Sequence, residues 1–204
     1  MDARIDPVDR SARWQHQLPV LVAAEHTLRQ LRPTDAGPLL AMLTSDDVTR
    51  HISPPPRTIE GFDRFIAKSL EEQAAGSSIC YGIVPKGYDC AVGIIQVRGI
   101  QPDLGHAEWG FALGEAFWGT GVFNPCAIAV VDFAIETMGI RRLEARATAA
   151  NARGNGALCK VGASPEGVLT SSFLKNGRYH DQLLWAILES EWREGREVET
   201  AQER

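Results

Sequence analysis

The sequence predicts a mixed α/β (α+β) fold around one sheet, on three observations. Apolar residues at helical spacing dominate the chain before residue 76, and alternating β-type runs follow. In the second half, a strand leads through a glycine-rich loop into a helix, and a further strand and helix follow. The length of 204 residues favours one domain. We expect an N-terminal arm over residues 1–24, a domain over 25–192 and a charged tail over 193–204.

Composition and charge exclude several functional classes. The 21 basic and 26 acidic residues give a formal charge of −5, with no basic stripe for nucleic acid. No apolar run is long enough for a membrane span, and the charged N-terminus lacks a signal peptide, so we expect a cytoplasmic protein without a membrane partner. The four cysteines form no Cys-x-x-Cys pair, so neither a metal site nor a disulfide framework is predicted.

The first predicted elements are a strand and a short helix. Residues 27–31 alternate between polar and apolar side chains, which is the pattern of a half-buried strand. Thr34 and Asp35 can each cap the N-terminus of a helix that continues to Leu43. The arm before this strand turns apolar around residues 18–22, so we expect it to lie on the domain.

A proline-rich loop separates this helix from a longer one. Residues 52–57 are ISPPPR, and three prolines remove backbone donors and fix φ, which excludes a helix or central strand. Thr58 can cap the next helix, whose apolar residues recur at helical spacing. Two β-type runs, 79–85 and 91–97, then flank a Lys-Gly turn and predict a hairpin.

The second half alternates strands and helices and closes with a hairpin about an Asn-Gly turn. The predicted elements are a strand over 106–113, a glycine-bearing stretch over 114–121, a helix over 122–138, a strand over 143–147, a helix over 151–162, and hairpin strands over 168–175 and 182–189.

The glycine-bearing stretch is the most informative part of the chain. Residues 107–122, AEWGFALGEAFWGTGV, place Gly119 and Gly121 between a strand and a helix. Glycines let backbone N–H groups converge, and the helix N-terminus adds positive potential, so a phosphate is the natural ligand. A tight turn without a ligand remains the alternative. The stretch has no Gly-Lys-Ser/Thr and no third glycine at dinucleotide-binding spacing, which disfavours both of those motifs.

Residues 116–121, Ala-Phe-Trp-Gly-Thr-Gly, resemble the acetyl-CoA signature (Gln/Arg)-x-x-Gly-x-(Gly/Ala) of the GNAT N-acetyltransferases, with Ala116 replacing the polar first residue. Asn151 and the stretch 155–163, NGALCKVGA, are similar to the family's Asn-x-x-Ser…Leu-x-Lys-x-Gly motif. Segments of the chain also resemble the branch that acetylates N-terminal amines of ribosomal proteins, and the resemblance spans about residues 25–192. The segments are residues 27–35, 166–169, 176–181 and 191–192.

The resemblance implies a GNAT fold, in which one central, mostly antiparallel, splayed sheet is flanked by helices, and an acetyl-CoA cosubstrate. The exposed strand edge would pair with the pantetheine amides, the loop N–H groups would hold the pyrophosphate, and the asparagines would meet the coenzyme near its pantetheine arm. The implied cofactor-binding residues are Phe111, Ala112 and Leu113 on the edge, Trp118, Gly119, Thr120, Gly121 and Val122 in the loop, and Asn151 and Asn155.

Glu108 is the candidate general base. The family's usual reaction is direct attack of an amine on the thioester, and the amine must lose a proton to a carboxylate or water. Members of the family often carry a base in this strand. Strand alternation places Glu108, Gly110 and Ala112 on one face, where the small residues leave room for a substrate. The alternative is a solvent-facing strand glutamate.

The general acid is harder to assign. Relatives often use a tyrosine early in the strand after the second helix of this unit, but residues 169–173 are Leu-Thr-Ser-Ser-Phe, and Gly154 replaces the motif serine. We take Ser172 as the candidate donor, with Ser171 and Tyr179 as alternatives, and the acid is dispensable if the thiol leaves unaided. The predicted function is transfer of an acetyl group to a primary amine, either a protein N-terminus or a small molecule, by a monomer or homodimer. The alternatives are a non-catalytic acyl-CoA-binding regulatory module and a transferase that uses another donor such as succinyl-CoA.

Overall fold

The computed structural model describes residues 13–202, and the side chains up to residue 196. The first twelve residues of the predicted arm lie outside the described residues. The rest of the arm forms helix α2 (Arg13–His16) and strand β1 (Leu21–Ala23). Trp14 and Leu18 are buried in the main core, so this part of the arm lies on the domain.

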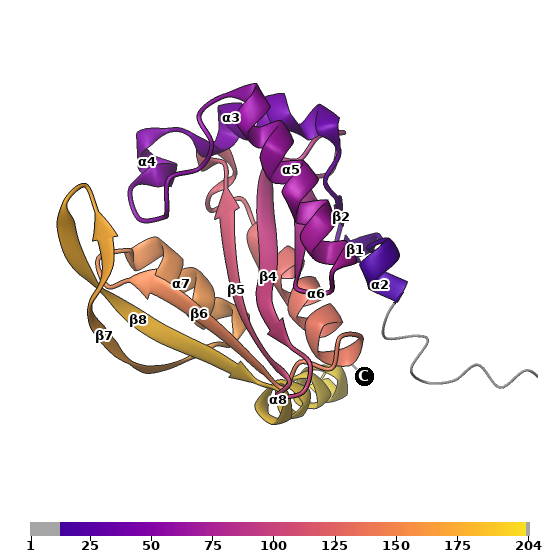
Figure 1. The fold of residues 1–204 in the computed structure, drawn as a ribbon. Helices are drawn as coiled ribbons and strands as arrows, with labels where there is room; N and C mark the ends of the chain where they lie inside the picture. The colour runs from indigo at the N-terminus through magenta and orange to yellow at the C-terminus, as the bar shows by residue number, and fades with distance from the viewer. Residues whose placement is uncertain (1–12, 203–204) are drawn as a thin grey trace, which may run out of the picture.

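Eight strands form one sheet in the order β1-β2-β3-β4-β5-β6-β8-β7 (Figure 1). Neighbouring strands are antiparallel except β5 and β6, which are parallel. This confirms the predicted mostly antiparallel sheet. The strands after β1 are β2 (His26–Gln30), β3 (Ser78–Val84), β4 (Gly93–Gln101), β5 (His106–Leu113), β6 (Arg142–Thr148), β7 (Ser164–Lys175) and β8 (Arg178–Leu188).

Helices cover the two faces of the sheet unequally (Figure 1). The larger core joins α6 and α7 to one face, through buried residues such as Tyr81, Trp109 and Leu143. A smaller core joins α3 and α5 to the other face, through Cys80 and Ile94. The helices are α3 (Ala36–Leu43), α4 (Asp46–Thr49), α5 (Ile59–Ala74), α6 (Phe123–Glu136), α7 (Ala152–Val161) and α8 (Glu189–Gln202).

The second face carries polar side chains where α3 and α5 do not reach it. Along β5 and β6, buried Trp109 and Ala145 alternate with half-buried Glu108 and Glu144 and with exposed Arg146. Because successive strand residues point to opposite faces, these three charged side chains share the face that α6 and α7 leave free. A polar and incompletely covered sheet face in the middle of a domain is a natural place for a substrate.

Strands β5 and β6 separate soon after they begin. Their register pairs residues 106–108 of β5 with residues 142–144 of β6, and Glu108 stands opposite Glu144 at the last pair. Beyond this pair, β5 stays bonded to β4 as far as Leu113, while β6 stays bonded to β8 as far as Thr148. The result is the splayed sheet that the family resemblance implies, with a V-shaped gap that opens from Glu108.

Asp35 stands at the N-cap position of α3, as predicted, but its side chain does not cap that helix. Its side chain makes no cap hydrogen bond, and its carboxylate instead forms a bidentate pair with the guanidinium of Arg29 at 2.8 and 2.9 Å. It also accepts hydrogen bonds from the backbone N–H groups of Arg32 and Ala91. Burial alone raises the pKa of Asp35, but these hydrogen bonds outweigh it and hold the pKa below its usual range. The pair fixes β2 against the start of β4.

Two segments contain more regular structure than the sequence predicts. The connection between α3 and α5 contains α4, which Ser45 caps by accepting a hydrogen bond from the N–H of Val48 at 3.4 Å. The expected charged tail, 193–204, continues helix α8 as far as Gln202. Trp192 anchors that helix on α6, because its indole N–H donates to Asp132 at 2.8 Å. No helix in the described part of the chain is long and apolar enough to cross a bilayer.

Candidate active site

The loop between β5 and α6 has the geometry of an anion site. Gly119 and Gly121 adopt φ angles of +72° and +88°, a region that favours glycine. Among the described residues, the backbone N–H groups of 119–122 have no hydrogen-bond acceptor, and no side chain caps α6 at Val122. Helix α6 is 14 residues long, so its N-terminal dipole reinforces these N–H groups. The loop can therefore receive a phosphate, as the motif predicts.

Trp118 links this loop to helix α7. Its indole N–H donates to the carbonyl of Leu113 at 2.9 Å, which fixes the ring at the end of β5. The guanidinium of Arg153 lies 3.7 Å from the ring centroid, a cation–π contact. Arg153 is the second residue after Asn151, and the motif analysis missed it because the motif leaves that position free. The contact places a cation beside the loop N–H groups.

The open edge of β5 leads from this loop to the vertex of the gap. Phe111, Ala112 and Leu113 pair with β4 on one side, and β6 has already separated from them on the other. Their backbone groups on the β6 side therefore have no strand partner. This is the edge that we expect to bind an amide-bearing chain such as pantetheine, and the contact itself stays a prediction.

Glu108 lies at the vertex, and its environment is that of a reachable carboxylate. Its side chain is 30% exposed and forms an ion pair with Arg98, whose Nη2 lies 2.6 Å from Oε1. The register from Glu108 to Leu113 is regular, which confirms the predicted alternation. At Gly110, an added Cβ would meet no atom within 4 Å except Arg98 Nη2 at 3.9 Å, so the face next to Glu108 is open.

Glu144, across the vertex from Glu108, belongs to a second charged group. It pairs with Arg142 at 2.9 Å and lies 3.4 Å from His106 Nε2. Arg142 also binds Glu166 through two hydrogen bonds, at 2.9 and 2.5 Å. Burial acts to raise the pKa of Glu144, but Arg142 outweighs it and the pKa is lowered. Glu144 is therefore an ionised, paired carboxylate, whereas Glu108 has the open space beside it.

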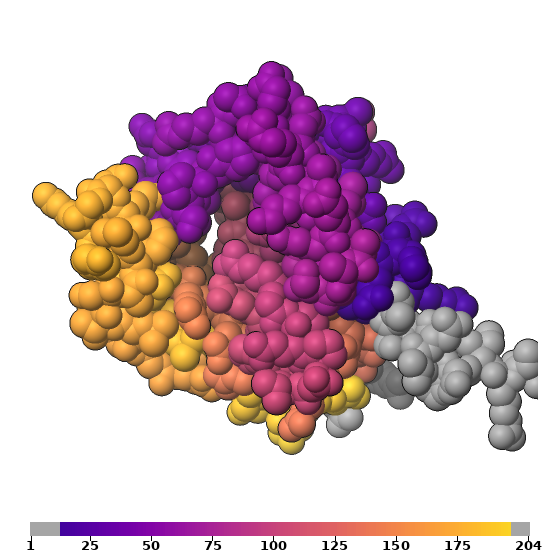
Figure 2. Space-filling model, in the orientation of Figure 1, coloured from indigo at the N-terminus to yellow at the C-terminus, as the bar shows by residue number. Residues whose placement is uncertain are grey.

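A loop and a hairpin enclose the space above this vertex. Figure 2 shows a hollow between the segment after α3, the β7–β8 hairpin and the strands of the open face. Lys175 of the hairpin donates from Nζ to the carbonyl oxygens of Thr49 and Ile52, the latter at 2.8 Å. His51 Nδ1 lies 3.2 Å from Thr148 Oγ1 at the end of β6. These contacts turn the gap into a bridged passage, and the proline-rich residues 52–57 form part of the bridge.

Ser172 is poorly placed to act as the acid that we predicted. Its hydroxyl donates to the carbonyl of Leu169 at 2.9 Å and lies 3.1 Å from Gln182 Oε1. A hydroxyl has one proton, and this proton is already engaged within the hairpin. The two alternative candidates are Ser171 and Tyr179. Ser171 has φ +50° and donates its backbone N–H to the side chain of Asp181, whereas the side chain of Tyr179 is exposed. A catalytic role for Ser172 stays a prediction, and the hydrogen bonds count against it.

The two candidate asparagines have structural partners. Asn151 caps helix α7 because its Oδ1 accepts a hydrogen bond from the N–H of Gly154 at 2.9 Å. Asn155 bridges three elements, with Nδ2 donating to the carbonyl of Thr148 at 3.1 Å and Oδ1 accepting from Trp185 at 2.9 Å. Their contacts with a coenzyme stay predictions. The structure adds that Asn151 caps α7 and that Asn155 holds this helix against β6 and β8.

We expect Asn151→Ala to lower the free energy of unfolding by about 1 kcal/mol, because an N-cap hydrogen bond is lost. Asn151→Asp should retain most of that stability, because aspartate is an equally good cap. Urea denaturation of the three proteins measures the difference. If Asn151→Ala is as stable as the wild type but binds acetyl-CoA less tightly, the side chain serves the coenzyme and its cap is of no consequence.

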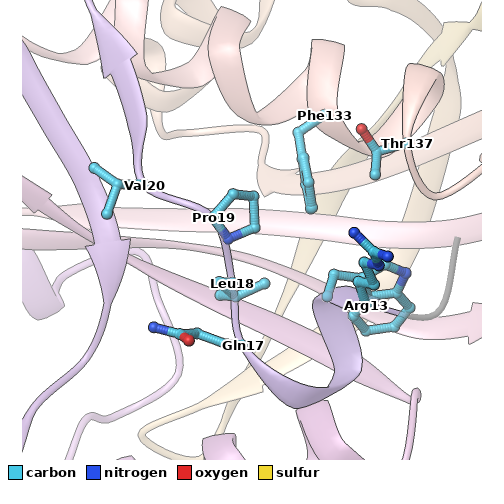
Figure 3. Close-up of a pocket in the computed structure, with 8 residues that line it drawn as sticks. Arg13, Gln17, Leu18, Pro19, Val20, Phe133 and Thr137 are labelled. Carbon is cyan, nitrogen blue, oxygen red and sulfur yellow. The ribbon is translucent and has the colours of Figure 1, made fainter. Parts of the chain in front are cut away.

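The cavity in Figure 3 lies away from these groups. It has a volume of about 310 Å³ and lies between α2, the residues before β1 and the end of α6. Phe133 and Thr137 line it, and Phe133 comes ten residues after the start of α6, about 15 Å along the helix axis from the glycine loop. This cavity therefore does not belong to the candidate active site.

A splayed mixed sheet with a glycine loop at a helix N-terminus is the arrangement that the family resemblance implies. Residues 26–164 match the family described as the acetyltransferase (GNAT) domain, and the chain belongs to this family of acetyltransferases.

Similar proteins include N-acetyltransferases from bacteria. The chain is 24% identical over 167 residues to an uncharacterised N-acetyltransferase, p20, from Bacillus licheniformis, covering 81% of this chain and 94% of the relative. It is 24% identical over 122 residues to the ribosomal protein uS5-alanine N-acetyltransferase of Escherichia coli, covering 59% and 63%. Among solved structures, the microcin C7 self-immunity acetyltransferase MccE, in complex with acetyl-CoA and AMP, has a TM-score of 0.74 at 20% identity, covering 81% and 93%.

Proposed function

We propose that this protein transfers the acetyl group of acetyl-CoA to a primary amine by direct attack, with Glu108 as the general base. The observation that carries the proposal is continuity along one strand. The edge of β5 runs from the loop with free N–H groups to Glu108, which is where β6 separates. If acetyl-CoA binds with its pyrophosphate at the loop and its pantetheine along the edge of β5, its thioester carbon lies toward the vertex.

The reaction needs one proton transfer and one bond exchange. The amine nitrogen attacks the thioester carbonyl carbon, an N–C bond forms, the C–S bond breaks, and coenzyme A leaves as the thiolate. The proton of the attacking nitrogen goes to Glu108, directly or through one water molecule. Arg98 holds the glutamate carboxylate in place at 2.6 Å and, as a guanidinium, competes for no proton. We assign no general acid, because a thiol with a pKa near 8.5 is a tolerable leaving group.

The acceptor amine must be neutral to attack, so an amine of lower pKa needs less help from the general base. An α-amino group has a pKa of about 7.7–8.0, whereas a lysine amine at about 10.4 is almost fully protonated. The uS5-alanine relative acts on an α-amine by its name, which supports an α-amine or a similar small amine here. We expect the cytoplasm to be its location, where acetyl-CoA is available.

Mass spectrometry of a cell extract incubated with the enzyme and isotope-labelled acetyl-CoA tests the proposal. The expected result is labelled acetyl on at least one primary amine, with matching release of free thiol. A protein that binds acetyl-CoA but labels nothing would instead be the non-catalytic binding module. Labelling from succinyl-CoA in preference to acetyl-CoA would show that the donor is different.

A further inference from the structure

The walls of the hollow carry opposite charges at its two ends. At the vertex, Glu108 and Glu144 face each other across β5 and β6. Above the vertex, Arg146 follows Glu144 on the same face of β6, two residues or about 6.6 Å further along the strand. The strand then reaches Thr148, which contacts His51 of the bridging loop.

The basic groups at the mouth of the hollow lack acidic partners. Arg146 and Arg57 are both exposed, and neither forms an ion pair within the part of the chain that the structure describes. Lys175 donates to two neutral carbonyl oxygens, so its charge is hydrogen-bonded and remains uncompensated.

The nearby acids do not neutralise these three cations. Asp47 pairs with Arg50 at 2.6 Å, and Asp181 accepts a hydrogen bond from the backbone of Ser171 in its own hairpin.

Lys175 lies beside the loop that carries His51 and Arg57, because its Nζ donates to the carbonyl groups of Thr49 and Ile52 on either side of His51. Burial lowers the pKa of Lys175, and the charge of Arg57 lowers it further. Burial likewise lowers the pKa of His51, with further lowering by Arg50, Lys175 and His180. The loop and the hairpin therefore bring positive charge together at the mouth. The whole protein has a net charge of −5, so its overall composition does not explain an excess of positive charge at this place.

We propose, on the basis of the function proposed above, that the acceptor is a small amine bearing a carboxylate or phosphate group. Arg146 binds this anionic group, with Arg57 and Lys175 at the mouth, while the amine reaches Glu108. A guanidinium suits either anion because its planar donors match two oxygens at once. Arg146 lies two residues along β6 beyond Glu144, the register partner of Glu108, so one small molecule can span the two sites. The bridges from Lys175 and His51 narrow the passage, which favours a small acceptor over a folded protein.

Matched pairs of acceptors test this inference. The pairs are free amino acids that have a primary amine and no side-chain carboxylate against their carboxamides, and O-phosphoethanolamine against ethanolamine. Carboxamides have the less basic amine, so without an anion site they should react faster. We expect at least one anionic member to be acetylated with a kcat/KM at least about tenfold above that of its partner without the anionic group. The amino-acid arm and the phosphate arm show which anion is preferred.

The variant Arg146→Gln should remove this preference, chiefly by raising KM for the anionic member about tenfold, with little change for its partner without the anionic group. Arg146→Lys should retain part of it. The control is Lys68→Gln on helix α5, an exposed lysine whose nearest acid is Glu72 at 3.5 Å, and it should keep the wild-type preference.

Several outcomes would overturn the inference. Equal use of the partners with and without the anionic group, or no turnover of any anionic member by a protein that binds acetyl-CoA, would leave the proposed function intact and remove the anion site. A change in the ratio of succinyl-CoA to acetyl-CoA use in Arg146→Gln, without a change in acceptor preference, would assign Arg146 to the donor. Failure to bind acetyl-CoA, measured as an absent rise in Tm, would overturn the proposed function and this inference with it.

Discussion

Gly119→Val and Gly121→Val are expected to abolish the rise in Tm that acetyl-CoA gives to the wild-type protein. Both glycines have positive φ, where a β-branched residue is strongly disfavoured, so valine must change the loop conformation. No atom lies within 4 Å of an added Cβ at either position, so the valine side chain itself causes no steric clash. The strain is confined to the backbone of the loop, and the rest of the protein should stay folded. The loss should therefore concern ligand binding, because the converging N–H groups are no longer aligned.

The size of the expected effect follows from mass action. At a concentration 100 times Kd, a ligand that binds only the folded state stabilises it by about 2.7 kcal/mol. For a chain of this size that corresponds to a rise in Tm of roughly 5–10 °C. Differential scanning fluorimetry with and without acetyl-CoA measures it.

Gly139→Val is the matched control for the loop variants. Gly139 also has φ +72° and no atom within 4 Å of an added Cβ, but it follows the C-terminal end of α6. Its Tm should fall by a similar amount, while the shift on adding acetyl-CoA should remain. If all three variants keep the full shift, the glycine loop does not bind the coenzyme.

The parts of the fold that the sequence predicts correctly are those with local signals. Thr58 caps α5 by accepting a hydrogen bond from Gly61 N at 3.0 Å, as its position before a helical pattern predicts. The alternation along β5 places Glu108 and Gly110 correctly because no bulge interrupts that strand between them. Such features depend on neighbours within a few residues, and the chain order contains them.

The parts that escape prediction depend on contacts between distant segments. Aspartate is a residue type that commonly caps helices. The side chain of Asp35 instead pairs with Arg29 and accepts a hydrogen bond from the backbone of Ala91, 56 residues away. Lys175 reaches carbonyl groups more than 120 residues earlier in the chain, so nothing local to the hairpin indicates the bridge. A loop–hairpin bridge of this kind is visible only once the sheet order is known.

Gly154 illustrates how a motif position can change for a packing reason. The family motif has serine there, and its absence raised the question of a missing catalytic group. In the structure, an added Cβ at Gly154 would lie 2.4 Å from Nδ2 of Asn151. Glycine at this position leaves room for the Asn151 side chain to cap α7. The missing serine is therefore not evidence of a lost activity.

Glu108→Gln is expected to lower turnover by at least about tenfold at neutral pH, within or below the 10²–10⁴-fold that general base catalysis typically contributes. Glutamine retains the shape of the side chain and can still accept a hydrogen bond from Arg98, but it cannot take the proton of the amine. Binding of acetyl-CoA should be unchanged, because its expected contacts are backbone groups further along β5 and in the glycine loop.

The pH profile separates a general base from a structural glutamate. As pH rises from 6 to 9, more of the acceptor amine is neutral in solution, so Glu108→Gln should recover part of the lost turnover. The control is Glu136→Gln at the end of α6, a half-exposed glutamate that pairs with Arg193 at 3.1 Å, and it should follow the wild-type profile. Equal turnover of Glu108→Gln and the wild type across this range, with a confirmed acceptor, would show that Glu108 is a partner of Arg98 and takes no part in the chemistry. A uniform loss at every pH, with acetyl-CoA binding weakened in parallel, would instead point to a disturbed vertex of the sheet.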